Sequence, residues 1–246
     1  MLSAWISARE TEFESRMTTK DSSLMKAFLK SIPVIGPFLV HLRRRQDDFK
    51  SSSDYWDRRY RTGGNSGAGS YHRLAQFKAN FLNMFVDQHQ IASVVEYGSG
   101  DGAQLKLARY PSYTGVDISP KAVEMCNILF SGDSSKRFLQ WDAVMPDFMA
   151  DLSLSLDVVY HLVEDPVFDA YMRRLFESAR RFVIVYSSNI DQDWPAKHVR
   201  HRHFTRWVEQ NRPDWCLQST LKNAYPYDPA DPKQTSFADF HVFAPR

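Results

Sequence analysis

The sequence predicts an α/β protein whose sheet is mostly parallel, with helices on both faces and an antiparallel hairpin at the C-terminal end. Three observations carry this prediction. A short apolar strand at residues 94–97 runs into a glycine-rich turn and then a helix. Apolar strands and amphipathic helices alternate from there to residue 186, as in parallel sheets joined by crossover helices. Residues 225–232 are rich in proline and cannot form a helix, so the last two strands are expected to pair as a hairpin.

Each expected strand is a short run rich in apolar residues, and each expected helix repeats its apolar residues at spacings of three and four. The seven strands are expected at residues 93–97, 113–117, 137–141, 156–160, 182–186, 217–221 and 239–244. The helices are expected at residues 71–88, 103–109, 119–130 and 166–176, with the basic run 198–206 as a further helical segment. Ser70 is the expected N-cap of the first helix, and Ser119 with Pro120 opens the third.

Length and composition fit one α/β domain preceded by an extension. The chain has 246 residues, of which 43% are hydrophobic, and its formal net charge is +2. We place the helical extension at residues 1–53 and the domain at residues 54–246. The near-neutral charge argues against nucleic acid as a partner, because nucleic-acid binding needs a broad basic surface.

Cysteine usage and hydropathy indicate a cytoplasmic protein. Cys126 and Cys216 lie far apart and predict neither a disulfide framework nor a zinc site. No other metal-ligand spacing stands out, so no metal is expected. The first residues lack the apolar core of a signal peptide, and no run approaches the roughly 18 apolar residues of a spanning helix.

Residues 24–45 combine an apolar stretch with the basic cluster Arg43-Arg44-Arg45. Apolar residues beside clustered positive charge are typical of a peripheral contact with an anionic membrane surface. The alternative is a helix that docks on the domain itself or on a second subunit. The sequence does not decide between these interpretations and does not give the oligomeric state.

The glycine-rich turn carries Gly98, Gly100 and Gly102 and follows the strand that holds Glu96. Glycine lets the backbone turn sharply and approach a ligand where a Cβ would clash. Gly98 and Gly100 with Ala103 also satisfy the loose dinucleotide-binding pattern, so a nicotinamide cofactor is an alternative at this point.

Acidic residues follow the next two strands. Asp117 ends the second strand and Asp142 follows the third. Because the carboxyl ends of parallel strands meet at one edge of the sheet, both are expected beside the glycine turn. The pattern E-x-G-x-G-x-G together with these two acids resembles the class I S-adenosylmethionine-dependent methyltransferases, from about residue 55 to the C-terminus. The resemblance implies their Rossmann-like fold and S-adenosylmethionine as the cofactor.

By this resemblance Asp117 binds the ribose hydroxyls, Asp142 reaches the adenine amino group, and the glycine turn faces the methionine part. The cofactor-binding residues that it implies are Trp56, Tyr60, Glu96, Gly98, Ser99, Gly100, Gly102, Asp117, Ile118, Asp142, Ala143 and Tyr160. Trp56 and Tyr60 are included in this set because of the segment that they belong to. They lie on an expected aromatic helix that precedes a second glycine-rich segment, residues 61–70. This arrangement resembles a segment that closes over the cofactor. The alternative is a flexible linker.

His161 follows the expected fourth strand directly, at the ligand end of the sheet. We expect it to act as general base, because the pKa of histidine lies near neutrality. The alternative is a histidine that only supports the site. His198, His201 and Arg202 are expected to bind the acceptor, since arginine suits an anionic group through bidentate contacts. A solvated basic helix face is the alternative, and His201 is the alternative base.

Two further stretches bear on the acceptor. The motifs Y-W-D-x-R-Y-x-x-G-G-N-S-G-x-G-S and H-x-R-H-R-x-F resemble those of bacterial methyltransferases associated with surface polysaccharide synthesis. This resemblance implies O-methylation of a sugar or another hydroxyl acceptor, a small molecule or part of a glycan. Two other classes stay open: a nicotinamide-dependent oxidoreductase, and a non-catalytic scaffold that keeps the cofactor fold.

Overall fold

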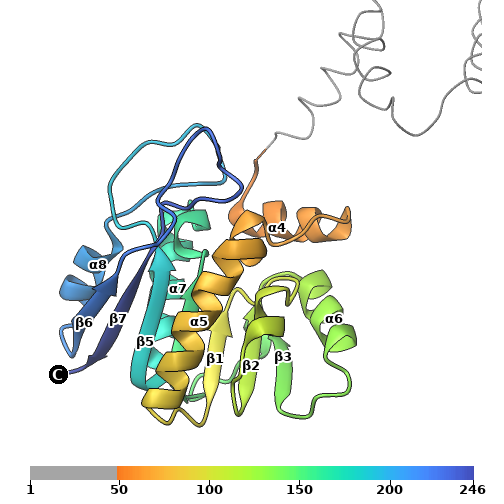
Figure 1. Cartoon of the computed structure of the whole chain (residues 1–246), viewed down its shortest axis with the longest axis vertical. Helices are drawn as coiled ribbons and strands as arrows, with labels where there is room; N and C mark the ends of the chain where they lie inside the picture. The colour runs from red at the N-terminus through yellow and green to blue at the C-terminus, as the bar shows by residue number, and fades with distance from the viewer. Residues whose placement is uncertain (1–48) are drawn as a thin grey trace, which may run out of the picture. The chain divides into compact units, whose positions relative to one another are not determined.

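A seven-stranded sheet forms the centre of the chain in its computed structural model, which describes residues 49–246. The strand order is β3-β2-β1-β4-β5-β7-β6, and β7 runs in the direction opposite to the other six strands. The strands are β1 (Val94–Tyr97), β2 (Tyr113–Asp117), β3 (Lys136–Gln140), β4 (Ala150–Leu156), β5 (Ala179–Ser187), β6 (Trp215–Leu221) and β7 (Asp239–Pro245). The mostly parallel sheet with C-terminal antiparallel strands confirms the predicted fold class (Figure 1).

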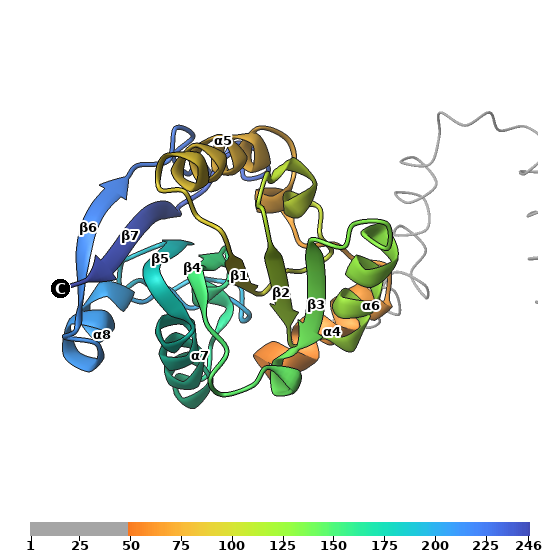
Figure 2. The same cartoon turned by 90° about the horizontal axis from the view of Figure 1, so that it is seen from below.

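Helices cover both faces of this sheet. The α-helices are α4 (Ser52–Arg61), α5 (His72–Gln88), α6 (Pro120–Leu129), α7 (Asp165–Glu177) and α8 (Phe204–Asn211). The short 3-10 helices are η1 (Ala68–Ser70), η2 (Gln104–Leu107), η3 (Trp141–Ala143) and η4 (Val159–His161). Helix α5 lies on one face of the sheet, and α7 and α8 lie on the other (Figure 2). Helix α4 lies across the end of the sheet at which the parallel strands finish (Figure 1).

Two hydrophobic clusters, one on each face, hold the layers together. In β5, Ile184 and Tyr186 belong to the first cluster, while Val183 and Val185 belong to the second. Successive side chains of a strand point to opposite faces, so both faces of β5 are covered. This is why the sequence of this strand is apolar throughout.

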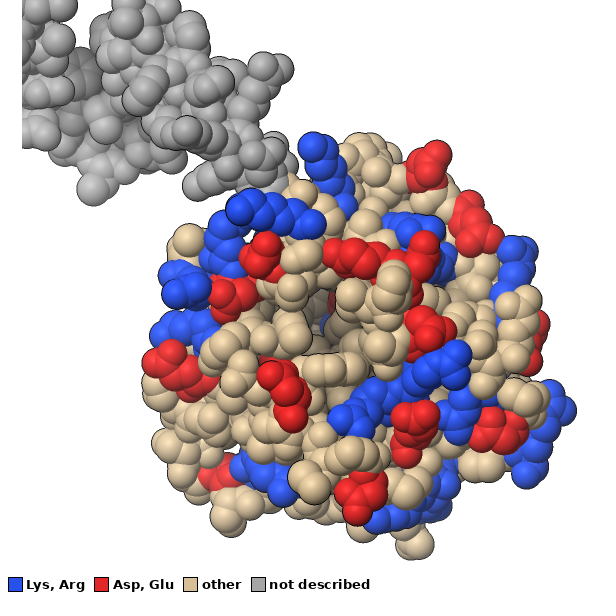
Figure 3. Space-filling view, turned by 180° about the vertical axis from the view of Figure 1, so that it is seen from behind, with Lys and Arg blue, Asp and Glu red and all other residues tan. Residues whose placement is uncertain are grey.

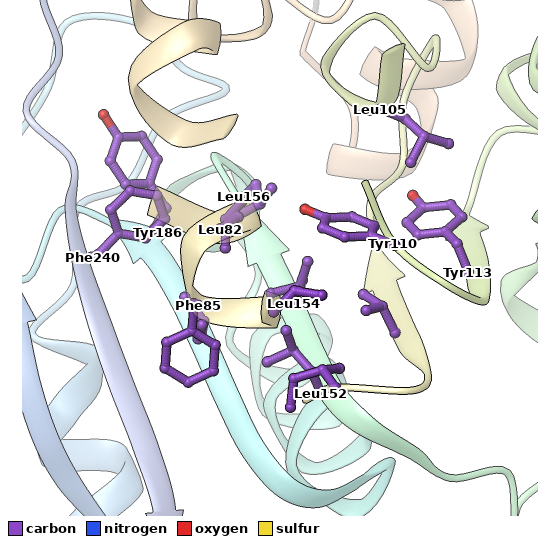
Figure 4. Packing of buried hydrophobic residues seen from close by; sticks show 14 of the residues in the cluster. Leu82, Phe85, Leu105, Tyr110, Tyr113, Leu152, Leu154, Leu156, Tyr186 and Phe240 are labelled. Atoms are coloured by element: carbon purple, nitrogen blue, oxygen red, sulfur yellow. The ribbon is translucent and has the colours of Figure 1, made fainter. Parts of the chain in front are cut away.

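The first cluster lies between α5 and the sheet (Figure 4). Leu82 of α5 is fully buried and packs with Leu152, Leu154 and Leu156 of β4. Full burial of a leucine side chain contributes about 1.5–3 kcal/mol relative to exposure. The serines between these leucines point to the opposite face, so leucine and serine alternate along β4.

The fourth strand lies earlier in the chain than predicted. We expected it at residues 156–160, but β4 spans Ala150–Leu156. Asp157 then takes a positive φ of 61°, and Val159–His161 form η4. The β-branched and aromatic residues after Asp157 favour a strand by propensity, but packing between two helix layers selects the leucine–serine alternation before it.

The helix expected at residues 103–109 is only the short η2. Its end is fixed by Asn83 of α5, whose side-chain amide donates to the Leu107 carbonyl at 2.9 Å. The same side chain accepts a hydrogen bond from the Arg109 backbone N–H at 2.8 Å. Asn83 thus replaces the hydrogen bonds that a longer helix would make.

Two other helix boundaries differ from the predictions. The N-cap position of α5 is Tyr71 rather than Ser70, and Tyr71 makes no capping hydrogen bond. Residues 198–203 are not helical, and α8 begins only at Phe204. The Arg200 backbone N–H donates to the Tyr160 carbonyl at 2.8 Å, so this segment bonds to η4 rather than to itself.

Ser51 is the N-cap of α4, and Ser52 and Ser53 are its first residues. The Ser51 side chain accepts a hydrogen bond from the Asp54 backbone N–H at 3.1 Å and caps the helix. Residues 24–45, with their expected membrane contact, lie outside the described residues, and the extension boundary at residue 53 stays a prediction. Within residues 49–246, none of the helices is both long and apolar enough to span a bilayer.

Candidate active site

A cavity of about 440 Å³ lies at the carboxyl ends of β1, β2 and β4, next to α4. Strand order reverses at this point, because β2 and β4 lie on opposite sides of β1, and open α/β sheets bind ligands at such crevices. The volume suits a small molecule, and a hollow opens on the face shown in Figure 3. The predicted site residues that line the cavity are Trp56, Tyr60, Glu96, Gly98, Ser99, Gly100, Asp117, Ile118 and His161.

The glycine turn requires glycine for reasons that the structure makes explicit. Gly98 and Gly100 have φ angles of +85° and +59°, in the region that side-chain-bearing residues avoid. A Cβ on Gly98 would collide with the side chain of Val158, and a Cβ on Gly100 would collide with the Ser66 hydroxyl. Between them, the buried Ser99 hydroxyl has no hydrogen-bond partner among the described residues, so it can bind a ligand in the cavity.

Asp117 is held in place by the backbone around it. Its Oδ2 accepts a hydrogen bond from the Gly100 N–H and its Oδ1 from the Ser119 N–H, both at 2.9 Å. Burial raises the pKa of Asp117, and the two backbone donors oppose that rise. A carboxylate has about four lone-pair positions, so Asp117 can still accept hydrogen bonds from two hydroxyl groups. This suits the predicted contact with a ribose.

Residues 51–71, which we call the strap, fold onto the glycine turn. Ser66 and Asp101 exchange two hydrogen bonds, from the Ser66 N–H to Asp101 Oδ2 and from the Asp101 N–H to Ser66 Oγ, both at 2.9 Å. The Tyr71 hydroxyl donates to Asp101 Oδ2 at 2.7 Å, and the Tyr60 hydroxyl lies 3.1 Å from Ser66 Oγ. The second glycine-rich segment is therefore packed against the cavity and is not a free linker.

The other end of the strap contacts the connection between β4 and α7. The Ser52 backbone N–H donates to Glu164 Oε1 at 2.8 Å, and the Ser52 hydroxyl lies 2.7 Å from the His161 carbonyl oxygen. Asp57 accepts a hydrogen bond from the Ser119 hydroxyl at 2.9 Å, which ties α4 to the start of α6. These contacts place α4 as one wall of the cavity.

His161 stands on the cavity wall with its protonation state defined by a hydrogen bond. Its Nδ1 lies 2.8 Å from the His198 carbonyl oxygen, and a carbonyl can only accept, so Nδ1 carries the proton. The lone pair of the neutral ring is then on Nε2. The Trp56 ring packs edge-on at a centroid distance of 4.8 Å. Burial lowers the pKa of His161 to about 4, so the ring is neutral at pH 7.

The cavity has an apolar end on the side of β2 and β3. There Ile118, Trp141 and Val167 contribute to its wall, with Ala170 and Tyr171 of α7. The Trp141 ring lies parallel to the Tyr171 ring, at a centroid distance of 5.9 Å and an interplanar angle of 10°. Flat aromatic and aliphatic surfaces of this kind suit a purine base.

The opposite end, on the side of β4 and α5, is charged. Lys78 Nζ lies 2.6 Å from Asp157 Oδ2, and its side chain is only 1% exposed. Asp157 Oδ1 accepts a hydrogen bond from the Tyr160 hydroxyl at 2.8 Å. Glu96 is buried nearby and accepts a hydrogen bond from the Tyr113 hydroxyl at 2.8 Å. Burial raises the pKa of Glu96 to about 7.

Four of the expected cofactor residues do not line the cavity. Gly102 packs against α6, and Asp142 and Ala143 are exposed on η3. Tyr160 is buried behind the wall, where it bonds to Asp157. A role of these residues in cofactor binding stays a prediction.

The residues expected to bind the acceptor also lie outside the cavity wall. The His198 ring stacks between Tyr55 and His161, at centroid distances of 4.2 and 5.5 Å. His201 is buried and its Nδ1 lies 2.7 Å from the Ser188 hydroxyl. Arg202 donates to Asp165 at 2.6 Å. Because residues 198–203 are not helical, His198 and Arg202 do not share the helix face that a helix over the basic run would have given them.

Among the cavity residues that sequence reasoning missed are the polar and charged side chains of Lys78, Asp101, Gln104 and Asp157. The sequence pattern could have identified one of these residues, Lys78. It lies four residues from both Leu74 and Leu82, on the apolar stripe of α5. A lysine on that stripe needs a buried partner. No cluster of three or more histidine, cysteine or acidic side chains suited to a metal ion occurs within residues 49–246.

Comparison with known proteins finds one family model and several solved structures that are similar to this chain. Residues 95–184 match the family model described as "Methyltransferase domain". A comparison with curated proteins finds no match. The chain resembles the N-methyltransferase NodS from Bradyrhizobium japonicum in complex with S-adenosyl-L-homocysteine, at 13% identity and a TM-score of 0.59, over 80% of this chain and 99% of that one.

Two other solved structures are similar. The magnesium protoporphyrin IX methyltransferase ChlM from Synechocystis PCC 6803 matches at 14% identity and a TM-score of 0.57, over 79% of this chain and 98% of that one. The methyltransferase domain of bacterial CtHen1 matches at 20% identity and a TM-score of 0.54, over 70% of this chain and all of that one. At these identities the likeness shows a common fold. An antiparallel β7 between β5 and β6 also separates this sheet from the dinucleotide-binding order 3-2-1-4-5-6.

The cavity fits the cofactor of such a domain. It offers an apolar slot for a purine, the Asp117 carboxylate for hydroxyl groups and the unpaired Ser99 hydroxyl between them. Residues 95–184 thus match a methyltransferase-domain model, within a chain that has the class I methyltransferase fold, and the cavity suits S-adenosylmethionine as the cofactor.

Proposed function

We propose that this protein transfers a methyl group from S-adenosylmethionine to a hydroxyl group of its acceptor, with His161 as the general base. The observation that supports this proposal is the position of His161 on the cavity wall with its proton fixed on Nδ1. When bound, the cofactor supplies a methyl group that is already activated on a sulfonium sulfur. The chain therefore has to orient the acceptor, exclude water and remove one proton.

His161 suits the last of these tasks. The His198 carbonyl orients the ring, and the Trp56 ring packs against it. A pKa near 4 makes Nε2 a weak base. A weak base is sufficient, because a hydroxyl proton becomes strongly acidic as its oxygen gains the methyl group. The low pKa also keeps the ring neutral throughout the physiological pH range.

The charge of the cavity favours an uncharged acceptor. Among the lining residues, the acids Glu96, Asp101, Asp117, Asp157 and Glu164 accompany a single lysine or arginine, Lys78. Arg202, which suggested an anionic acceptor, is paired with Asp165. Repulsion by the acids would disfavour a uronic acid or a phosphate. We therefore propose a neutral sugar hydroxyl, in keeping with the resemblance to enzymes of polysaccharide synthesis.

An amine acceptor is the second candidate, and the same excess of acids favours it. An amine attacks as the neutral base and loses its proton without help, so methylation of an amine should not depend on His161. The His161→Gln variant therefore separates the two acceptor classes.

The test compares His161→Gln with His89→Gln, a control at the C-terminal end of α5 that packs on Phe85 and Phe182. Each variant receives neutral sugars, amino sugars and uronic acids, and S-adenosylhomocysteine formation is measured. For a hydroxyl acceptor we expect kcat to fall at least about 100-fold in His161→Gln. The affinity for S-adenosylhomocysteine should stay unchanged, and His89→Gln should match the wild type. Equal turnover of the two variants on a hydroxyl acceptor would rule out His161 as the base.

A further inference from the structure

Two long loops bring together three aromatic side chains, which we call the aromatic shelf. The loop after β5 supplies Trp194, and the loop between β6 and β7 supplies Tyr227 and Phe237. The centroid of the Trp194 ring lies 5.4 Å from the centroids of both other rings. Both loops lie at the end of the sheet that α4 crosses (Figure 1). The shelf is therefore at the same end of the sheet as the cavity.

The outer part of the aromatic shelf is open to solvent. Phe237 packs against the first hydrophobic cluster, but Trp194 and Tyr227 belong to neither cluster. Tyr227 is 38% exposed, and Trp194 is half-buried. Each of these two side chains combines a flat apolar face with an N–H or O–H group. A sugar ring matches this combination, because it has apolar C–H faces and hydroxyl groups at its edge.

His201 lies beneath the aromatic shelf and gives an independent sign of a missing hydroxyl group. Its ring packs edge-on against Trp194 and Phe237, at centroid distances of 4.9 and 4.5 Å. Nδ1 lies 2.7 Å from the Ser188 hydroxyl oxygen, but the buried Nε2 has no hydrogen-bond partner in the part of the chain that the structure describes. A hydroxyl group can donate and accept, so it would satisfy Nε2 in either tautomer.

A line of ring contacts connects the aromatic shelf with the candidate base. The Phe237 ring lies 4.8 Å from the Tyr160 ring, and the Tyr160 ring lies 4.5 Å from the ring of His161, which lines the cavity. The Arg200 backbone N–H donates to the Tyr160 carbonyl at 2.8 Å and ties the loop after β5 to η4. A sugar ring is about as large as one aromatic ring. A sugar on Trp194 is therefore not the one whose hydroxyl group meets His161.

The charges near the aromatic shelf favour a neutral ligand. Residues 191–197 and 225–233, which carry Trp194 and Tyr227, contain four aspartates and two lysines. Burial lowers the pKa of His201, so its ring is neutral at pH 7. These stretches thus offer no excess of positive charge to an anionic glycan or to an anionic membrane surface.

We propose that the acceptor is an oligosaccharide and that the aromatic shelf binds a neutral sugar further along the chain than the sugar that is methylated. This inference rests on the proposed transfer to a sugar hydroxyl and extends it from one sugar to several. The loop that carries Tyr227 is held in place by its own hydrogen bonds. The Asp228 N–H donates to Thr235 Oγ1 at 3.1 Å, and the Ser236 N–H donates to the Tyr225 carbonyl at 3.0 Å. A shelf fixed in this way loses little entropy when a ligand binds.

The test compares monosaccharides, disaccharides and trisaccharides of glucose, galactose and mannose as acceptors, and measures S-adenosylhomocysteine formation. In the wild type, KM for the accepted sugar should fall at least about 10-fold from the monosaccharide to the trisaccharide. Trp194→Ala should raise KM for the trisaccharide about 10-fold and leave both kcat and the monosaccharide KM unchanged. Trp194→Phe keeps a ring at this position and should retain most of the preference. Tyr227→Ala should raise the trisaccharide KM about 3-fold.

Trp207→Ala is the matched control, because Trp207 is a half-buried tryptophan of α8 that packs on Phe168, away from the aromatic shelf. It should keep the wild-type preference for longer chains. Thermal melts check that each variant folds. If Trp194→Ala does not fold, Tyr227→Ala carries the test, because Tyr227 is exposed. Equal KM values for monosaccharide and trisaccharide, or an equal rise of both in Trp194→Ala, would overturn the proposal.

A second measurement separates this inference from the proposed function. Trisaccharide binding to the wild type with S-adenosylhomocysteine is followed by the change in tryptophan fluorescence, which requires no turnover. Binding that Trp194→Ala weakens, without turnover of any sugar, would support the aromatic shelf and refute transfer to a sugar hydroxyl. Turnover without a preference for longer chains would refute the shelf alone. Neither binding nor turnover of any of these sugars would refute both.

Discussion

Replacing Glu96 by glutamine should stabilise the folded protein at pH 8. Glu96 is buried at the end of β1, and burial raises its pKa from 4.5 to about 7. Between these two values the folded state retains a proton that the unfolded state has lost. The free energy of unfolding therefore falls as pH rises through this window and stays lower above it. Glutamine has a similar shape, does not ionise and can still accept the Tyr113 hydroxyl hydrogen bond.

The size of the effect follows from the two pKa values. Their difference of about 2.5 corresponds to ~3 kcal/mol, at about 1.4 kcal/mol per pH unit. Urea unfolding of the wild type and Glu96→Gln across this pH range measures it. The stability of the variant relative to the wild type should rise by about this amount from pH 4.5 to 8. Subtracting the wild-type curve removes the opposite contribution of His161. A difference that does not change with pH would refute the reasoning.

Two further substitutions test how the strap and the glycine turn fit together. Gly100→Ala should destabilise the protein by more than about 1 kcal/mol in thermal unfolding, because φ is positive and the new Cβ meets Ser66. Gly132→Ala, where a Cβ meets no atom within 4 Å, should have almost no effect, and equal losses would contradict this account. Asp101→Asn should weaken the bonds to Ser66 and Tyr71 and speed proteolysis within residues 61–70. Burial favours a higher pKa for Asp101, but hydrogen bonding outweighs it and keeps this pKa below its ordinary value. The wild-type strap should therefore resist cleavage down to mildly acidic pH. Equal cleavage of the wild type and Asp101→Asn would contradict this role.

The sheet could be predicted from the sequence because its strands differ sharply from their surroundings. The apolar run at residues 182–186 and the glycine turn after β1 have few other interpretations. The fourth strand was misplaced because the residues after Asp157 have a higher β-propensity than Ala150–Leu156. Burial of Ser153 and Ser155 inside the sheet is a tertiary effect that the local pattern does not contain.

The candidate site was predicted best where its residues share one motif. Gly98, Gly100 and Asp117 come together through the strand order of a parallel sheet, which the sequence pattern specifies. Lys78 and Asp157 are 79 residues apart, so their ion pair depends on how α5 crosses the sheet. No local spacing predicts such a contact.

In the basic run, residues 198–206, the local pattern predicted a helix that forms only from Phe204 onward. A helix over residues 198–206 would have placed its cations on one face, but hydrogen bonds to neighbouring segments compete with helix formation. Arg200 bonds to the Tyr160 carbonyl, and His203 N–H donates to Asp191 at 2.9 Å. The arginines are then used within the fold, for example in the pair between Arg202 and Asp165.

The most direct test of the central claim is calorimetric titration of the purified protein with S-adenosylhomocysteine, with NADH in parallel. The account predicts binding of S-adenosylhomocysteine in the micromolar range and no binding of NADH. Asp117→Ala should weaken that binding by about 1.5–3 kcal/mol, through loss of charge-assisted hydrogen bonds. Binding of NADH alone would contradict the account, and binding of neither ligand would favour a scaffold that keeps the fold without the cofactor.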